Sequence, residues 1–526
     1  MKTISFYGVS MLLLIATPYC VDAQNRNKTK TDSIAVAQRT QEIRDSLNVI
    51  MGKAKAGDAD AMNEIGTWYY TGKHVTKDYK QAYEWWKQAS LKQNVRAIAN
   101  LGLCYQLGHG VERDSVDAVR LYVKSIKDGN SSLLRQRSEN ASNSPFDAML
   151  SGQCFEKGIG VNKDLSKAAR FYTLAANKGS VDGMRQTGIC YLNAKDHVNA
   201  LRYFEKGASS GDLSSLYWAG KMLLGGMNVP TDKNQAVVYL FKAAEGGMSA
   251  AQNEIGTLYA EGNGVTKNLY SAADWYKKAA RNGNAKGMWN YGLALKDGLG
   301  TERDYDQALF WMAEAASEGY QRAFNRMIVQ LDSLGSDPFL QYVYGMRLYL
   351  IDGKMKEANN MFKNVDKYKI VEGKIMQAVI LASKRNEKAN ATKAAKNLEK
   401  LSTDDAEAAF YLATLYETGN GVEQSMIKAI SLYRAASDMG YGKSQCYLAD
   451  IYYEGRGTEK DLLTAVSLYQ KALDCRQLTQ KGATLLAECY ENGLAGLTQD
   501  KKRAEQLRSA KYEDHVSALL RKVDIK

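Results

Sequence analysis

The chain has 526 residues, with 44 Gly, 33 Tyr and only 4 Pro. Few prolines and few β-branched runs predict a nearly all-helical chain in which glycine turns separate the helices. The net charge of +12 is spread over many lysine-rich segments without a basic block that interleaves aromatic residues. Solvated helix faces explain this charge better than nucleic-acid binding, so no nucleic-acid partner is expected.

Residues 1–23 have the pattern of a secretory signal peptide. An apolar stretch at 11–16 precedes Val21-Asp22-Ala23, whose side chains suit signal peptidase, so cleavage is predicted before Gln24. We therefore expect an exported protein, periplasmic or secreted. No later segment offers 18 uninterrupted apolar residues, so no integral membrane segment is expected after signal removal. Lipid anchoring through Cys20 is a minor alternative, because the bulky residue before this cysteine fits a lipoprotein site poorly.

Residues 24–56 are predicted to form a polar linker and then an N-terminal capping helix. The Lys/Thr-rich start gives way to apolar residues at helical spacing, namely Ile34, Val36, Ile43, Leu47, Ile50 and Met51. Such a helix would cover the open end of the first unit of a repeat array.

Ten times along the chain a helix-capping residue stands four positions before an alanine, and five of the nine intervals between successive cappers are 36 residues. The pairs are Asp78/Ala82, Asp114/Ala118, Asp164/Ala168, Asp196/Ala200, Asp232/Ala236, Asn268/Ala272, Asp304/Ala308, Ser425/Ala429, Asp461/Ala465 and Asp500/Ala504. Self-similarity at this period predicts an all-α fold. We expect an α-solenoid, or superhelix, of stacked antiparallel helix pairs with about ten recognisable repeats plus drifted ones.

Other landmarks keep the same register as the capper. About twelve residues upstream lies a small residue with an aromatic three positions later, as in Gly102 and Tyr105, and a glycine-rich turn such as 108–111 follows. The small residue would let the second helix approach, and glycine would end the first helix in a left-handed conformation. The unit closes with Ala-Ala-x-x-Gly, as at 175–179.

This combined pattern resembles the Sel-one-like repeat, a relative of the tetratricopeptide repeat with a longer loop between its helices. The resemblance covers two arrays, residues 57–320 and 405–510. It implies an interaction scaffold whose partners differ from protein to protein. Some family members carry a cysteine pair in every repeat and bind penicillin. That pairing is absent here, which puts any such carry-over in doubt.

Three segments depart from the repeat. The 14 residues that lengthen one interval fall near Asn130 to Ser144 and are expected to form a Ser/Asn/Arg-rich loop. Residues 321–404 keep helical periodicity without clear landmarks and are expected to be a drifted helical-repeat segment, either a bend or a separate subdomain. Residues 511–526 are expected to form a C-terminal capping helix and a basic tail.

We expect the cysteines to pack in the core rather than to form disulfides. Cys104, Cys154, Cys190 and Cys489 each follow the small residue of a first helix by two positions. Equivalent positions in stacked repeats lie about 9 to 10 Å apart, beyond the roughly 7 Å limit for a disulfide. Cys446 and Cys475 lie outside this register.

Catalytic, metal and cofactor motifs give negative results. The chain has four histidines without a His-x-x-x-His pair, so no metal site is predicted. Gly442-Lys443-Ser444 copies the end of a phosphate-binding loop, but Ser437 replaces its leading glycine and the segment is a turn between repeats. No catalytic residue and no cofactor is expected.

The first helix of each unit should line the concave face of the solenoid. Residues three before, one after and four after its small residue should share a stripe that points away from the second helix. The candidate partner-binding residues on this stripe are Asn63, Thr67, Tyr70, Gln153, Glu156, Tyr217, Lys221, Asn253, Thr257, Trp289, Leu293 and Lys296. Tyr217 and Trp289 are candidate anchors, with packing between neighbouring repeats as the other interpretation of both.

These features predict a non-catalytic, monomeric, exported scaffold that binds a protein or peptide on its concave face, with an envelope glycan as a further ligand class. Two alternatives remain open at this point. One is a cell-wall hydrolase or β-lactam-processing enzyme, and the other is a purely structural envelope protein.

Overall fold

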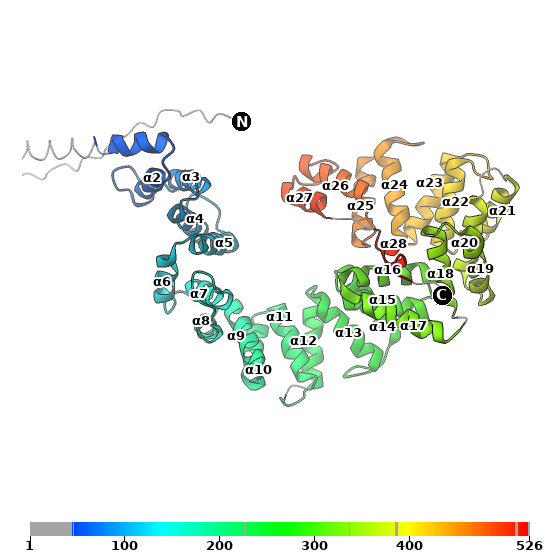
Figure 1. The fold of residues 1–526 in the computed structure, drawn as a ribbon, viewed down its shortest axis with the longest axis horizontal. Helices are drawn as coiled ribbons and strands as arrows, with labels where there is room; N and C mark the ends of the chain where they lie inside the picture. The colour runs from blue at the N-terminus through cyan, green and yellow to red at the C-terminus, as the bar shows by residue number, and fades with distance from the viewer. Residues whose placement is uncertain are drawn as a thin grey trace, which may run out of the picture. The chain divides into compact units, whose positions relative to one another are not determined.

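The structure is a computed structural model that describes residue 45 and residues 47–225, 228–335, 337–383, 388–510 and 514–523. The predicted signal peptide, most of the linker and the last three residues of the chain lie outside these residues. Throughout the described ranges the regular elements are helices, and the predicted all-α solenoid of helix pairs is confirmed (Figure 1). No helix of the described ranges combines the length and the apolar character needed to cross a bilayer.

The chain divides into two compact units, residues 1–215 and 216–526. The first unit contains α2 (Ala59–Thr71), α3 (Tyr79–Leu91), α4 (Val95–Leu107), α5 (Ser115–Lys127), α6 (Ser131–Asn140), α7 (Pro145–Lys157), α8 (Leu165–Asn177), α9 (Val181–Asn193) and α10 (His197–Ser209). The boundary falls within α11 (Leu213–Leu223).

The second unit continues the helix pairs. It contains α12 (Lys233–Glu245), α13 (Ser249–Glu261), α14 (Leu269–Arg281), α15 (Ala285–Asp297), α16 (Tyr305–Ala315), the π-turn Ala316–Tyr320, α17 (Gln321–Ser333), α18 (Pro338–Leu350), α19 (Met355–Lys367), α20 (Val371–Ser383), α21 (Lys388–Glu399), α22 (Ala406–Thr418), α23 (Met426–Asp438), α24 (Gly442–Glu454), α25 (Leu462–Asp474), α26 (Gln480–Asn492), α27 (Lys501–Ser509) and α28 (His515–Leu520).

The pair α4 and α5 shows how the sequence builds one repeat. Gly108 ends α4 with a φ of 75°, and its N–H bonds the Cys104 carbonyl. Asp114 then caps α5, because its carboxylate accepts the N–H groups of Val116 at 2.8 Å and Asp117 at 3.0 Å. A Cβ on Gly102 would lie 3.1 Å from the Tyr122 ring, so this glycine lets the two helices approach as expected.

The second glycine of the turn has a role that the sequence did not reveal. A Cβ on Gly110 would lie 2.3 Å from the carbonyl oxygen of Tyr79, at the start of the second helix of the preceding repeat. Gly300 makes the same contact more tightly, with its hypothetical Cβ 1.9 Å from the Leu269 carbonyl oxygen. The turn of one repeat therefore rests directly on the backbone of the repeat before it.

The insertion near Asn130 is not the loop that its composition suggested, because residues 131–140 form helix α6. Leu133 and Leu134 on this helix are buried in the core beside α5 and α7. Arg137 also anchors the helix, because its guanidinium lies 3.0 Å from the buried carboxylate of Asp147. Burial of two adjacent leucines offsets the weak helix propensity of the Ser and Asn residues around them.

The drifted segment keeps the repeat geometry. Helices α17 to α21 occupy residues 321–399, where the sequence keeps helical periodicity, and a Cβ on Gly345 of α18 would lie 2.7 Å from the Phe362 ring of α19. This is the close approach that glycine provides in the recognisable repeats, so the segment retains the helix-pair architecture without the sequence landmarks.

The C-terminal segment packs elsewhere than expected. Helix α28 contacts α16 and α18, and Leu519, Leu520 and Val523 are buried in the core that those helices share. It therefore packs onto the middle of the second unit, whereas a terminal cap would lie on α26 and α27. At the other end of the chain, Leu47 and Ala54 are buried against α2 and α3, which is the position expected of an N-terminal cap.

Candidate functional site

A polar groove of about 740 Å³ lies on the first helices of the first two repeats. Asn63 and Thr67, two of the predicted stripe residues, line it together with Asp60 and Glu64 of α2 and Arg96 of α4. Asn94 Nδ2 donates to Asp60 Oδ1 at 2.7 Å. The groove therefore joins adjacent first helices through side-chain amides and carboxylates.

Paired asparagines recur between neighbouring first helices. Asn100 Nδ2 donates to Asn63 Oδ1 at 3.0 Å, and Asn290 Nδ2 donates to Asn253 Oδ1 at 2.9 Å. Both pairs are separated by 37 residues, so the same contact is present in both units of the chain. Asn63 is half-buried at the groove, whereas Asn253 is only 2% exposed.

Part of the predicted stripe faces the second helix of its own repeat, contrary to expectation. Tyr70 packs on Trp86 with ring centroids 5.2 Å apart, and the Tyr172 hydroxyl donates to Glu156 Oε2 at 2.7 Å. The Tyr276 hydroxyl donates to Thr257 Oγ1 at 3.4 Å. Four residues turn an α-helix only about 40° beyond a full turn, so Tyr70 and Glu156, each four positions after the small residue, must lie beside the helix–helix contact.

The remaining stripe residues have mixed surroundings. Lys221 Nζ lies 3.1 Å from Glu254 Oε1, and Lys296 pairs with its neighbour Asp297. Trp289 and Leu293 are half-buried and pack against the large core of the second unit.

The two candidate anchors share one property, which is partial burial. Trp289 lies beside Tyr320 with ring centroids 6.1 Å apart, and Tyr217 lies beside Trp218 at 5.5 Å. Gln153 is also half-buried. The packing of Trp289 agrees with the second interpretation of this residue.

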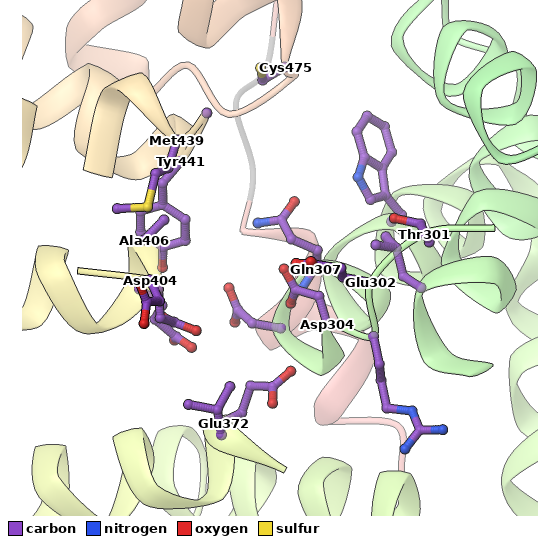
Figure 2. A pocket seen from close by; sticks show the side chains of 18 of the residues that line it. Thr301, Glu302, Asp304, Gln307, Glu372, Asp404, Ala406, Met439, Tyr441 and Cys475 are labelled. Carbon is purple, nitrogen blue, oxygen red and sulfur yellow. The ribbon is translucent and has the colours of Figure 1, made fainter. Parts of the chain in front are cut away.

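A second cavity, of about 790 Å³, lies wholly within the second unit (Figure 2). Figure 2 shows Asp304 and Gln307 on one side, Asp404, Ala406 and Tyr441 on the opposite side, and Glu372 between them. The carboxylates in its wall are Glu302, Asp304, Asp306, Glu372, Asp404, Asp405 and Glu407, the cations are Lys277, Arg281, Arg303 and Lys400, and the aromatic residues are Tyr291, Trp311 and Tyr441.

Several of the acidic residues in this cavity lie at the N-termini of helices. Asp304 is the N-cap of α16 and accepts from Gln307 N at 2.8 Å, while Asp405 is the N-cap of α22 and accepts from Ala408 N at 2.9 Å. Glu372 lies in the first turn of α20, and its carboxylate accepts the N–H of Tyr305. Carboxylates are favourable at helix N-termini, because the helix dipole presents positive charge there.

Burial, together with the crowding of these carboxylates, raises their pKa values. Burial, then repulsion from Glu372 and Asp306, raises the pKa of Asp304 to about 8. Burial raises the pKa of Glu372 to about 7 despite its hydrogen bond from Tyr305, and burial followed by repulsion from Asp306 raises the pKa of Glu407 well above its usual range. By contrast, the equivalent cap Asp164 has a lowered pKa, chiefly because it accepts the Lys167 N–H.

Two polar side chains in the cavity wall have no hydrogen-bond partner. Both carboxylate oxygens of Glu407 are buried and unpartnered, and so is the Tyr441 hydroxyl. Glu407 is 6% exposed and Tyr441 is 5% exposed. Such groups normally cost free energy unless something satisfies them.

Lys443 is a cation that pairs with one of these acidic residues. Its Nζ lies 3.7 Å from Asp306 Oδ2, and its side chain is 48% exposed. Desolvation opposes its charge, but Asp306 and Glu407 attract it more strongly, so the pKa of Lys443 is raised. In the described part of the chain, no three His, Cys, Asp or Glu side chains are arranged to hold a metal ion.

None of the cavity carboxylates was among the predicted site residues. Asp304 was interpreted only as a helix cap, and the cluster Asp404-Asp405-Ala406-Glu407 was not distinguished from other helix starts. An unusual density of acids at two helix starts was the available signal. Their convergence depends on contacts between distant repeats, which the local pattern does not contain.

Comparison with known proteins identifies the repeats. The Sel1 repeat model matches at residues 59–94, 95–130, 148–180, 181–212, 213–248, 249–284, 285–320, 406–441, 442–475 and 480–507.

A putative sel1-like repeat-containing protein of Acanthamoeba polyphaga mimivirus is 33% identical over 87 residues, or 16% of each chain. The matched region thus spans about a sixth of that relative's length.

Among solved structures, c5321, described as a protective antigen of uropathogenic Escherichia coli with an SLR fold, is 23% identical, covers 91% of this chain and 98% of its own, and has a TM-score of 0.37. A Sel1 repeat protein from Oxalobacter formigenes is 29% identical over 48% of this chain and 98% of its own, with a TM-score of 0.28. Because the ten matched repeats occupy more than half of its length, the chain belongs to the Sel1 repeat family.

Proposed function

We propose that this protein is a non-catalytic, exported, monomeric scaffold that binds an extended protein or peptide segment along the first-helix face of its repeats. The observation that carries the proposal is the polar groove of about 740 Å³ on α2 and α4, with the Asn63–Asn100 pair beside it. Repeat solenoids of this kind present extended surfaces on which interaction partners bind.

Side-chain amides suit the recognition of an extended backbone. An asparagine carries both a donor and an acceptor, so it can bond the N–H and C=O groups of a peptide that is not in a helix or sheet. The groove also offers the hydroxyl of Thr67, which is exposed, and the charges of Glu64 and Arg96. An envelope glycan could use the same donors and acceptors, and it is the second ligand class of this proposal.

A peptide library displayed on phage tests the groove directly. The change is Asn63→Ala combined with Asn100→Ala, which should abolish enrichment of binding peptides while far-UV circular dichroism stays unchanged. Gln81→Ala is the matched control, because Gln81 is an exposed amide on the second helix of the first repeat. Equal enrichment by the double variant and the wild type would exclude this groove as the site.

Export and the anchors can be tested separately. The mature N-terminus should be Gln24, which N-terminal sequencing of the exported protein would show, whereas labelled fatty acid on Cys20 would establish a lipid anchor instead.

Trp289→Ala should abolish partner capture with unchanged melting temperature if Trp289 is an anchor. A large fall in melting temperature would assign it to the core.

A cell-wall hydrolase is the second candidate, favoured by the raised pKa values of Asp304 and Glu372 in one cavity. Paired carboxyls of this type serve as general acids in glycoside hydrolysis. Here, however, both carboxylates already accept backbone N–H groups at helix starts, which favours binding over catalysis. Release of dye from labelled peptidoglycan by the wild type but not by Asp304→Asn would establish the enzyme.

A further inference from the structure

The acidic cavity of the second unit holds more carboxyl groups than its own cations pair with. Burial, followed by repulsion between neighbouring carboxyls that include Asp306, raises the pKa values of Asp304, Glu372, Asp405 and Glu407. Lys443 pairs with one of them, Asp306, and is half-exposed. The two buried oxygens of Glu407 lack a hydrogen-bond donor altogether.

Cations also line this cavity. Lys277 and Arg281 of α14 line the same space, and Arg281 reaches toward the Cys475 sulfur at 3.8 Å. Burial, followed by repulsion from Arg281, lowers the pKa of Lys277. Arg303 and Lys400 are further cations in the wall. Among the described contacts, none of these four cations forms an ion pair with the acidic cluster.

The size and the walls of the cavity suit a small organic ligand. Its volume of about 790 Å³ falls within the roughly 300 to 1,000 Å³ of typical ligand sites. Trp311, Tyr291 and Tyr441 provide aromatic surface on which a planar cation can pack. A guanidinium group is planar and has five N–H donors, so it can satisfy several carboxylate oxygens at once.

We propose that this cavity binds a basic amino-acid residue of the arginine type, with its guanidinium against Glu407 and Asp306 and its α-carboxylate against Lys277 and Arg281. The guanidinium provides the donors that Glu407 and the Tyr441 hydroxyl can use, since a hydroxyl accepts as well as donates. The site is independent of the groove on α2 and α4, so either proposal can fail without the other.

Binding of a cation at this cluster should release protons. In the free protein the raised pKa values of Asp304, Glu372 and Glu407 keep these carboxyls partly protonated near neutral pH. A bound guanidinium favours the ionised forms, as an opposite charge nearby always does. The other titratable and charged groups that face the cluster are Asp306, Asp405, Lys443, Tyr342, Tyr411, Tyr441 and Asp514.

Isothermal titration calorimetry of the full chain separates the possible ligands. The probes are L-arginine, L-citrulline, agmatine, and acetyl-Gly-Gly-Arg with a free C-terminus. Citrulline keeps the shape of arginine without its charge, and agmatine lacks the carboxylate. We expect arginine or the tripeptide to bind at least about tenfold more tightly than citrulline, because hydrogen bonds to charged groups are the strong ones. Agmatine should also bind more weakly than arginine.

The same titration identifies the source of the ligand. Binding of the tripeptide but not of free arginine would identify the ligand as the C-terminus of a peptide. Binding of free arginine but not of the tripeptide would identify it as a free amino acid. Titration in buffers of different ionisation enthalpy at pH 7 should reveal proton release in either case. Equal binding of citrulline and arginine would overturn the proposal, as would a response to Ca²⁺ or Mg²⁺ alone in place of arginine. Agmatine binding as tightly as arginine would overturn the role given to Lys277 and Arg281.

Variants complete the test. Glu407→Gln should weaken arginine or tripeptide binding by about tenfold or more, with a melting temperature of the free protein that is unchanged or higher, because a buried unpartnered carboxylate is removed. Glu423→Gln is the matched control at an exposed position and should bind like the wild type. Tyr441→Phe removes only the unpartnered hydroxyl and should weaken binding while the fold is kept. Unchanged affinity in both Glu407→Gln and Tyr441→Phe would refute the site.

Discussion

Arg476 Nε lies 3.0 Å from Glu314 Oε2, although the two residues are 162 positions apart in the chain. Glu314 belongs to α16 and is buried, and the Nδ1 atom of His515 is a hydrogen-bond partner of its other carboxylate oxygen. The loop after α25 and the start of α28 therefore meet on one carboxylate of α16. This contact brings the C-terminal repeats to the middle of the second unit, beside the acidic cavity.

Replacing Arg476 by Ala should destabilise the second unit. It leaves the buried Glu314 carboxylate with one partner, and Arg476 itself is 31% exposed. We therefore expect a loss of about 1 to 3 kcal/mol in the free energy of unfolding, below the usual cost of breaking a fully buried pair. Urea denaturation followed by tryptophan fluorescence measures it. Arg508→Ala is the control, because Arg508 pairs with Glu491 at the surface and should cost less than about 1 kcal/mol.

The repeat cap makes a second prediction. Asp114→Ala should reduce stability by roughly 0.5 to 2 kcal/mol, because the amides of Val116 and Asp117 lose their acceptor. Asp114→Asn should retain most of the stability, since asparagine is an equally good cap. Chemical denaturation of the three proteins provides the comparison. If Asp114→Ala left the stability unchanged but abolished ligand binding, Asp114 would have a functional role instead.

The acidic cavity predicts a pH dependence of stability. The pKa of Asp304 is raised to about 8 in the folded state, so between its ordinary range near 4 and about 8 the folded protein binds more protons than the unfolded chain. The contribution of Asp304 to the free energy of unfolding therefore decreases as pH rises through that window. Asp304→Asn keeps the cap and removes the titration, so its stability relative to the wild type should increase between pH 5 and pH 8.5.

Melting curves at several pH values would measure this difference. Glu372→Gln should behave similarly, with the change largely complete near the Glu372 pKa of about 7. Asp164→Asn is the matched cap control, because the pKa of Asp164 is lowered and its titration falls below this window. Parallel pH profiles for Asp304→Asn and the wild type would contradict the raised pKa.

Thiol reactivity provides a further prediction. Cys104, Cys154, Cys446 and Cys489 are buried free cysteines, whereas Cys190 and Cys475 are half-buried. Burial raises the pKa of Cys104 to about 12 and, with Lys157 opposing, that of Cys154 to about 11, which suppresses the reactive thiolate. A thiol reagent should label Cys190 and Cys475 first and the buried group only after denaturation. Protection of all six until a reductant is added would indicate disulfides and contradict this assignment.

The helix pairs were predictable because their determinants are local. Asp114, Gly102 and Gly108 act within a single repeat, so spacing alone located the cap, the close contact and the turn. Cys190 was expected to be buried with the other three cysteines of its register, but it lies in the wall of a cavity of about 450 Å³. A repeat position thus predicts the helix face more reliably than the depth of burial.

A second local signal, present in several repeats, is a hydrogen bond between the two helices of the repeat. The residue four after the small one accepts a hydrogen bond from the tyrosine of the second helix. Tyr122 donates to Gln106 at 2.8 Å, and Tyr433 donates to Glu417 at 2.7 Å. Both pairs are 16 residues apart, as are Tyr172 and Glu156. The acidic cavity, by contrast, depends on the distant meeting of α16 with α22 and α24, and no single repeat encodes that meeting.

Gly300 has a mechanical consequence beyond its own turn. Any side chain there would strike the Leu269 carbonyl oxygen and wedge two neighbouring repeats apart. In a stacked array a wedge at one junction tilts everything that follows it, and the displacement grows with each further repeat. The contact between Arg281 of α14 and Cys475, 3.8 Å apart, would then be strained by a change that touches neither residue, because Arg281 lies before this junction and Cys475 after it. The absence of a side chain at Gly300 therefore sets the spacing between these two repeats, and that spacing decides whether the loop after α25 still reaches α14.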